Sequence, residues 1–157
     1  MEEKQTVEIL LAEDSPSDAL LVQECFRESP IPNRVHVVAD GEDALDFLKR
    51  EACFEHAPRP DLILLDLNIP KVHGLTVLAT VKADPDLQQI PVIVLTASAI
   101  EEDVHRAYHL QANSYLSKPT DLIELKAMIE SIERHWLTHV RLPSTPSQDS
   151  AALDANA

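Results

Sequence analysis

Short apolar runs alternate with segments of helical spacing along this chain. Five runs have the length and composition of strands: Val7–Leu11, Val35–Ala39, Leu62–Leu65, Val92–Leu95 and Ser114–Leu116. The runs at 62–65 and 92–95 contain no polar residue at all. Strands covered on both faces of a sheet have this composition, so the pattern predicts a buried, parallel sheet.

Each predicted strand is followed by a segment with the apolar spacing of an amphipathic helix. The first opens at Ser15-Pro16-Ser17-Asp18, where Ser15 suits the cap position and Pro16 the first helical turn. We expect Thr120 to cap the last helix. The apolar stripes of the other four helices are Ala44, Leu45, Phe47 and Leu48; Leu75, Leu78 and Val81; Ile100, Val104, Ala107 and Tyr108; and Leu122, Leu125, Met128, Ile129, Ile132 and Trp136.

The order of strand and helix, repeated five times, predicts an α/β fold. We expect a doubly wound, five-stranded parallel sheet with helices on both faces, because parallel neighbours need helical crossovers. One domain would occupy residues 1–142, including an extension of the last helix. Residues 143–157 have no apolar period and are expected to form a flexible tail. In such folds the functional site lies at the carboxyl ends of the strands.

Composition narrows the possible partners. The 157 residues include 13 Lys and Arg against 27 Asp and Glu, a formal net charge of −14. A polyanion is repelled by nucleic acid and by anionic lipid, so neither is an expected partner. No run approaches the roughly 18 apolar residues of a membrane span, and no secretory signal opens the chain. Cys25 and Cys53 are the two cysteines, and we expect free thiols in the cytoplasm.

Reactive side chains follow the predicted strands. Glu13-Asp14 follows the first strand, Asp66 the third and Thr96 the fourth, and Lys118 comes just past the fifth. Carboxylates gathered at one edge repel one another unless a cation lies among them. A hard cation such as Mg²⁺, which needs few protein oxygens and keeps its waters, suits such a cluster.

Phosphoryl transfer is the chemistry that uses every member of this set. An aspartate can act as a nucleophile and carry a phosphoryl group. Mg²⁺, Lys118 and the Thr96 hydroxyl would then each neutralise or bind one phosphoryl oxygen. Taken singly, an acidic pair, an Asp after a strand or a Lys-Pro dipeptide is more often an ordinary loop feature. The prediction depends on their joint placement at successive strand ends.

These motifs closely resemble the receiver domains of two-component response regulators. The resemblance extends over residues 7–135. It implies a flavodoxin-like sheet with strand order 2-1-3-4-5 and phosphotransfer from a sensor histidine kinase to Asp66. It is carried by Glu13-Asp14 after Ile9-Leu10-Leu11-Ala12, by Leu64-Leu65-Asp66-Leu67-Asn68-Ile69-Pro70, by Leu95-Thr96-Ala97, and by Tyr115-Leu116-Ser117-Lys118-Pro119.

The resemblance also implies a role for each matching residue. Glu13, Asp14, Asp66 and the backbone carbonyl of Asn68 would form the metal site. Asp66, Thr96 and Lys118 would carry out the phosphotransfer, and Thr96 would form a switch pair with Tyr115. Lys118–Pro119 would be a cis peptide bond. His73 stands where receivers usually have Asp, and we expect it to be exposed.

Two further stretches resemble the small response regulators of bacterial and cyanobacterial phytochromes. They are Ala57-Pro58-Arg59-Pro60-Asp61-Leu62, and Ile132-Glu133-Arg134-His135-Trp136-Leu137 followed by Val140-Arg141-Leu142-Pro143. This implies a phytochrome kinase as partner. It also implies a homodimer formed through the C-terminal extension and the face of segments 100–108, 114–116 and 122–136. The protein would signal to a downstream protein target, with no DNA-binding domain attached.

Other functions were weighed against this interpretation. An aspartate-nucleophile phosphatase needs a second acid two residues after Asp66, where this chain has Asn68. A flavin module needs a phosphate loop rich in glycine or hydroxyl groups, but the loop after the first strand is acidic. A degenerate receiver that acts only as a scaffold would lack the intact set. His105/His109 and His135/His139 have metal-binding spacing, although solvated histidines explain them better.

Overall fold

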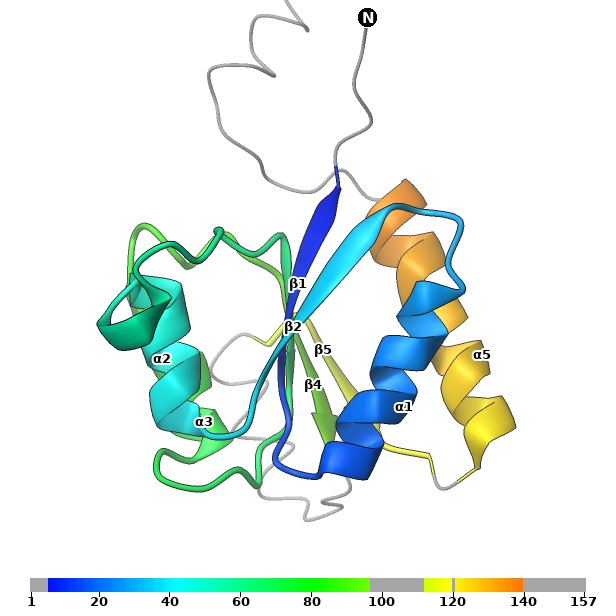
Figure 1. Cartoon of the computed structure of the whole chain (residues 1–157), viewed down its shortest axis with the longest axis horizontal. Helices are drawn as coiled ribbons and strands as arrows, with labels where there is room; N and C mark the ends of the chain where they lie inside the picture. The colour runs from blue at the N-terminus through cyan, green and yellow to red at the C-terminus, as the bar shows by residue number, and fades with distance from the viewer. Residues whose placement is uncertain (1–5, 97–111, 120, 140–157) are drawn as a thin grey trace, which may run out of the picture.

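The computed structural model describes residues 6–96, 112–119 and 121–139 (Figure 1). The strands are β1 (Val7–Ala12), β2 (Asn33–Val38), β3 (Leu62–Leu65), β4 (Val92–Thr96) and β5 (Ser114–Ser117). The helices are α1 (Pro16–Arg27), α2 (Gly41–Lys49), the 3₁₀ turn η1 (Ala52–Phe54), α3 (Gly74–Ala83), α5 (Leu122–Ile132) and the π-helical η2 (Glu133–His139). The helix expected at 100–108 falls outside the described residues.

The five strands form one parallel sheet in the order β2-β1-β3-β4-β5. This confirms the predicted fold class and strand order. The second strand begins two residues earlier than its apolar run, at Asn33, and pairs there with Val7. The start of β2 is therefore determined by backbone pairing with β1, which cannot be predicted from the apolar pattern.

Helices cover both faces of the sheet, with α1 and α5 on one side and α2 and α3 on the other (Figure 1). Successive residues of β1 explain how two cores arise, because side chains alternate between the faces of a strand. Ile9 and Leu11 belong to the α1–α5 cluster, whereas Leu10 and Ala12 belong to the α2–α3 cluster. All four residues of β3 are buried, so the central strand is fixed from both sides.

The predicted cap of the first helix is confirmed, whereas the last helix is capped by a different residue from the one expected. The Ser15 hydroxyl accepts a hydrogen bond from the Asp18 amide, which confirms the first cap. The last helix is capped by Asp121, whose carboxylate accepts from the amides of Ile123 at 2.7 Å and Glu124 at 3.3 Å. The expected cap, Thr120, lies outside the described residues, and a carboxylate is the stronger acceptor for two amides.

Two further expectations have mixed outcomes. Leu122 is 55% exposed, so the buried stripe of α5 begins at Leu125 rather than at the first apolar residue. Cys25 is buried and Cys53 exposed, and both are free thiols.

In the described part of the chain, no helix has the length and apolar character needed to cross a membrane.

Candidate functional site

The acidic residues expected at the site follow two strands that are neighbours in the sheet. Ala12, the last residue of β1, is in register with Leu65, the last residue of β3. The Asp66 amide also donates to the Ala12 carbonyl at 3.1 Å, so the pairing continues one residue past the strand. Glu13, Asp14 and Asp66 are thereby brought together at the carboxyl edge.

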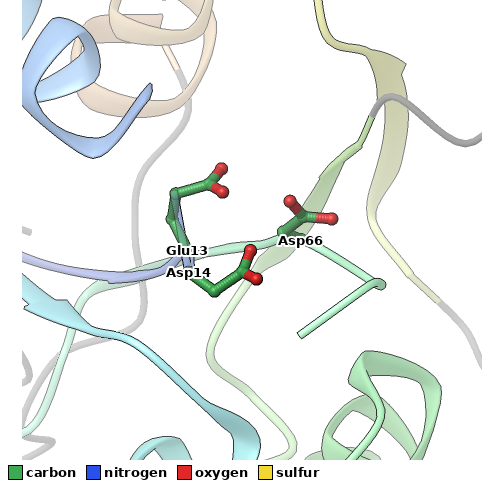
Figure 2. Close-up of side chains that lie close together, drawn as sticks. All are labelled: Glu13, Asp14 and Asp66. Carbon is green, nitrogen blue, oxygen red and sulfur yellow. The ribbon is translucent and has the colours of Figure 1, made fainter. Parts of the chain in front are cut away.

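One carboxylate oxygen from each of these three residues lies within 4.8 Å of the other two. Figure 2 shows the three carboxylates gathered in the same space beside the strand ends. Glu13 and Asp66 are buried, whereas Asp14 is exposed. The cluster therefore has two fixed members and one that faces solvent.

Lys118 brings a positive charge to the cluster from the end of β5. Its ammonium lies 2.6 Å from Glu13 Oε1, 3.0 Å from Asp18 Oδ2 and 3.1 Å from Asp66 Oδ2. Burial alone would lower the pKa of Lys118. The hydrogen bonds to Glu13 and Asp18 and the charge of Asp66 outweigh burial, so the pKa lies above its ordinary value. Lys118 is a permanent cation at this site.

Both buried carboxylates are oriented by backbone amides as well. The Asn68 amide donates to Asp66 Oδ1 at 3.0 Å, and the Ser15 amide donates to Glu13 Oε2 at 3.1 Å. Burial raises the pKa of Glu13, while the hydrogen bonds from Lys118 and Ser15 act in the opposite direction. Two donors hold each carboxylate in a defined position.

Asp18 is a member of the site that the sequence did not reveal. Its amide serves the cap of α1, as expected, but its carboxylate also binds Lys118. The spacing Ser-x-x-Asp predicts only the capping role. The contact joins residues 100 positions apart, and no local pattern could have indicated it.

The donor set fits a hard divalent cation. Three carboxylates contact the one ammonium, and Asp14 adds a fourth carboxylate next to Glu13 and Asp66, so the cluster keeps an excess of negative charge when all are ionised. The ligand atoms are carboxylate oxygens, which Mg²⁺ and Mn²⁺ both accept. The exposed position of Asp14 also leaves space for the water ligands that Mg²⁺ retains.

The loop after Asp66 is fixed against α2 and α3. The Gly41 amide donates to the Pro70 carbonyl at 3.1 Å, and the ammonium of Lys71 lies 3.6 Å from Asp40 Oδ2. A Cβ at Gly74 would lie 2.5 Å from Leu67 Cα and 2.6 Å from the Asp66 carbonyl oxygen. Only glycine permits this close approach, so α3 begins directly against the backbone of the predicted phosphoacceptor.

His73 is exposed, as expected, but it also has a structural role. Its Nδ1 accepts a hydrogen bond from the Leu75 amide at 3.1 Å and caps α3. The imidazole thus provides a cap where receivers usually have an aspartate.

The remaining predicted residues are only partly described. Tyr115 in β5 is half-buried against the α2–α3 cluster. Thr96 ends β4 in register with Ser117, but its side chain lies outside what the structure describes. Asn68 is exposed next to Asp66. His105 and His109 are not among the described residues.

The expected cis bond between Lys118 and Pro119 is wrong for this structure, because every described peptide bond is trans. The two forms of a bond preceding proline differ by only about 0.5–1 kcal/mol, in favour of trans. With the trans bond, the Lys118 ammonium contacts Glu13, Asp18 and Asp66.

Comparisons with known proteins agree with this geometry. The family model described as "Response regulator receiver domain" matches residues 9–130. The chain is 48% identical to response regulator Rcp1 of Synechocystis sp., over 87% of this chain and 92% of Rcp1. The crystal structure of the phosphorylated cyanobacterial phytochrome response regulator RcpA is also similar, with a TM-score of 0.86 and 43% identity over 89% and 100% of the two chains.

The Mn²⁺-bound structure of Rcp1 is similar as well, with a TM-score of 0.84 and 47% identity over 88% of this chain and 99% of that one. A related protein thus binds a divalent metal, and this chain has an acidic cluster suited to one. The chain belongs to the response regulator receiver domain family of two-component signalling proteins.

Proposed function

We propose that this protein accepts a phosphoryl group on Asp66 from a sensor histidine kinase, in a reaction that requires Mg²⁺. The observation that carries the proposal is the environment of the Asp66 carboxylate. It is buried, oriented by the Asn68 amide, and 3.1 Å from the Lys118 ammonium. A fixed nucleophile beside a permanent cation is suited to a phosphoryl group, whose oxygens are negatively charged.

In the proposed step, a carboxylate oxygen of Asp66 attacks the phosphorus of the kinase's phosphohistidine. The new O–P bond forms as the P–N bond breaks. The bonding electrons remain on the imidazole nitrogen, which then takes a proton from solvent. The product is an acyl phosphate on Asp66 and a free histidine on the kinase. As negative charge develops on the phosphoryl group, the Lys118 ammonium would exchange a carboxylate contact for a contact with a phosphoryl oxygen.

Glu13, Asp14, Asp66 and the backbone carbonyl of Asn68 would hold the metal. When bound, Mg²⁺ neutralises charge on the phosphoryl oxygens. The oxygens of Glu13 and Asp14 would hold it next to Asp66. We assign Thr96 to a further phosphoryl oxygen, and Tyr115 to the switch that responds when the Thr96 hydroxyl moves.

The signal would pass through protein contacts rather than DNA. Phosphorylation would shift an existing equilibrium in the face that includes β5 and α5. RcpA is a phytochrome response regulator, which supports a phytochrome as the kinase partner here. We further propose that the receiver domain, with its C-terminal extension, occupies residues 1–142, and that residues 143–157 form a flexible tail. The protein would form a homodimer through that face and the C-terminal extension. Its location would be cytoplasmic.

Phosphorylation with a small donor tests the central claim. The protein is incubated with Mg²⁺ and acetyl phosphate, and its intact mass is measured. We expect one phosphoryl adduct that Asp66→Asn abolishes. Asp61→Asn is a matched control, because it makes the same substitution at the residue just before β3, whereas Asp66 lies just after β3. An adduct that persists in Asp66→Asn, or no adduct on the parent protein, would contradict the proposal.

Sedimentation tests the dimer separately. The full chain and a chain that ends before Trp136 are compared with and without phosphodonor. We expect the shorter chain to lose self-association, because Trp136 continues the apolar face of α5. A full chain that stays monomeric under both conditions would exclude the homodimer and leave the phosphotransfer proposal intact.

A further inference from the structure

The outer edge of β2 is a strand edge that the proposed function does not use. β2 comes first in the strand order β2-β1-β3-β4-β5, so only one of its edges is paired in the described structure. Figure 1 shows β2 as the front strand of the sheet, between α1 and α2. β5, which belongs to the face proposed for the homodimer, ends the sheet on the other side. The two edges are therefore separate surfaces.

The register between β1 and β2 shows which backbone groups of β2 point outward. In a parallel pair, a bonded residue contacts the residues before and after the one opposite it. Val7 lies opposite Asn33, and its amide donates to the Pro32 carbonyl at 2.9 Å. Successive residues of a strand direct their amides and carbonyls to alternate edges. The residues of β2 whose amides and carbonyls point away from β1 are therefore Asn33, Val35 and Val37.

These outward groups have no backbone partner among the described residues. Val37 is 38% exposed, and Asn33 and Val35 are half-buried. Beside them lies an open groove of about 370 Å³ between α1 and β2, whose apolar lining is Val35 and the exposed Leu20. An unpaired edge with apolar neighbours is a template on which another strand can pair.

Charged side chains normally keep such an edge unpaired, but the charges here are balanced within the chain. The Arg34 guanidinium lies 3.0 Å from Glu8 Oε2, and His36 Nε2 lies 2.7 Å from Glu8 Oε1. On α1, the Arg27 guanidinium lies 2.6 Å from Glu24. The edge thus has no excess of acid, whereas the whole chain has a net charge of −14. A second copy of the chain is repelled less here than at an acidic surface.

A second copy also matches this edge by symmetry. When two copies of β2 lie antiparallel about a twofold axis at Val35, each Val35 faces its counterpart. Asn33 then faces Val37 of the second copy. Opposite residues that both point outward exchange both backbone hydrogen bonds, and a pair of β-branched side chains on one face is favourable. The outward groups of the two copies therefore match without a change of register.

We propose that a second copy of this chain pairs with the outer edge of β2, antiparallel and about a twofold axis at Val35. The sheets of the two copies then become continuous. Because the paired segment is short, this contact forms at higher protein concentration than the homodimer proposed above. The paired residues lie outside the acidic cluster, so phosphorylation of Asp66 can be measured in the same variants.

Val35→Pro tests this proposal in the full-length protein. Proline removes an amide that points away from β1, so the pairing of β2 with β1 is retained. The twofold axis makes one substitution remove two intermolecular hydrogen bonds. In sedimentation equilibrium over a series of concentrations, we expect Val35→Pro to weaken this association by about tenfold or more. Val35→Thr, the matched control, keeps the amide and the side-chain shape and should associate nearly as well as the parent.

The measured mass distinguishes this contact from the homodimer. If the homodimer forms, the parent should grow beyond a dimer at high concentration, and Val35→Pro should stop at the dimer. If the homodimer does not form, the parent should reach a dimer, and Val35→Pro should stay monomeric. Equal masses for the parent and Val35→Pro at every concentration would overturn the strand pairing and leave the phosphotransfer proposal intact. Phosphorylation of Asp66 at the parent rate shows that the variants are folded.

Amide hydrogen exchange locates the contact without any substitution. The amides of Val35 and Val37 point outward, whereas the His36 amide points toward β1. In dilute protein, the two outward amides should exchange fast and the His36 amide slowly. Raising the concentration should slow exchange at Val35 and Val37 by about tenfold or more, and should change His36 little. Outward amides whose exchange does not depend on concentration would contradict the proposal, whether or not Val35→Pro folds.

A peptide experiment shows whether the edge selects this chain. The peptide Asn-Arg-Val-His-Val-Val has the sequence of β2, and a scrambled peptide has the same residues in another order. Added to dilute protein, the β2 peptide should slow exchange at Val35 and Val37, and the scrambled peptide should do so much less. Equal protection by both peptides would assign the edge to extended segments of any protein, and the assignment to a second copy would be wrong.

Discussion

Asp66, which follows β3, and Glu133, which begins η2, are buried to almost the same extent, 6% and 7% exposed. Their surroundings differ completely. Asp66 receives the Asn68 amide on one oxygen and the Lys118 ammonium on the other. Glu133 has a donor for one oxygen and none for the second in the described part of the chain. Burial alone therefore does not determine what a carboxylate can do.

The difference shows how this chain prepares a nucleophile. Donors from two separate elements orient the Asp66 carboxylate before any phosphodonor arrives, so no reorganisation is needed at that point. Glu133 has been buried without this support, and burial raises its pKa. The first arrangement suits chemistry, whereas the second leaves one buried carboxylate oxygen without a donor in the described part of the chain. Each of the following changes alters one side of this comparison.

Replacing Lys118 with Met should have the largest effect, because it leaves Glu13 and Asp66 buried without their cation. We expect the free energy of unfolding to fall by about 3 kcal/mol without metal. Mg²⁺ should recover part of this loss. Phosphorylation of Asp66 should slow by about 100-fold, since one charge-stabilising donor is gone. Urea unfolding and intact-mass time courses measure the two effects. Unchanged stability would mean that the ammonium contacts contribute little.

Replacing Asp14, the exposed carboxylate of the cluster, should remove most of the stabilisation that the metal gives. A metal ion present at about 100 times its dissociation constant stabilises a folded protein by about 2.7 kcal/mol. We expect Mg²⁺ to raise the melting temperature of the parent protein, and Asp14→Asn to lose most of this rise. Without metal, Asp14→Asn should melt at the same temperature or slightly higher, because like charges are fewer. Glu51→Gln, an exposed acid elsewhere, should retain the full response.

Adding one methyl group at Gly74 should displace the backbone of Asp66 and Leu67, and with it the nucleophile. Its Cβ would overlap Leu67 Cα and the Asp66 carbonyl, so the loop must move. Overpacking of this kind costs about 1–3 kcal/mol. We expect Gly74→Ala to lose stability and to be phosphorylated more slowly. Thr76→Ala, on the exposed side of the same helix, should change neither, and equal behaviour of the two variants would contradict the packing argument.

Neutralising Glu133 should have the smallest effect and the opposite sign. A carboxyl with a raised pKa stabilises the fold only while it is protonated. Its contribution is complete below the unfolded-state value, near 4.5, and is lost as pH rises through the higher folded value. Glu133→Gln should therefore be more stable than the parent by about 1 kcal/mol at pH 7 and equal to it at pH 4. Denaturant unfolding at several pH values measures this, and a gap that narrows as pH rises would contradict it.

Most of the fold follows from residue pattern because burial and chain direction act locally. The uninterrupted apolar runs that became β3 and β4 predicted central strands, and the Ser15 cap was equally visible. Once parallel strands are established, their ends must share one edge. Glu13, Asp14 and Asp66 therefore meet where the sequence placed them.

The features that the sequence did not predict have different causes. Asp18 reaches Lys118 across 100 positions, and its local pattern already had an adequate explanation as a cap. Asp121, rather than Thr120, caps α5 because two amides converge on its carboxylate. Glu133 had a signal that was overlooked. It follows Leu125 and Ile129 at intervals of four, so the buried stripe of α5 continues onto an acidic residue.

The burial of β3 on both faces determines when its amide hydrogens can exchange with solvent. All four residues of β3 are buried and pair with β1, those from Ile63 onward also pair with β4, and the Asp66 amide is bonded to Ala12. Such amides exchange only through opening of nearly the whole domain. In deuterated water, the backbone that carries the phosphoacceptor should be among the last to take up label, whichever state the surrounding loops adopt.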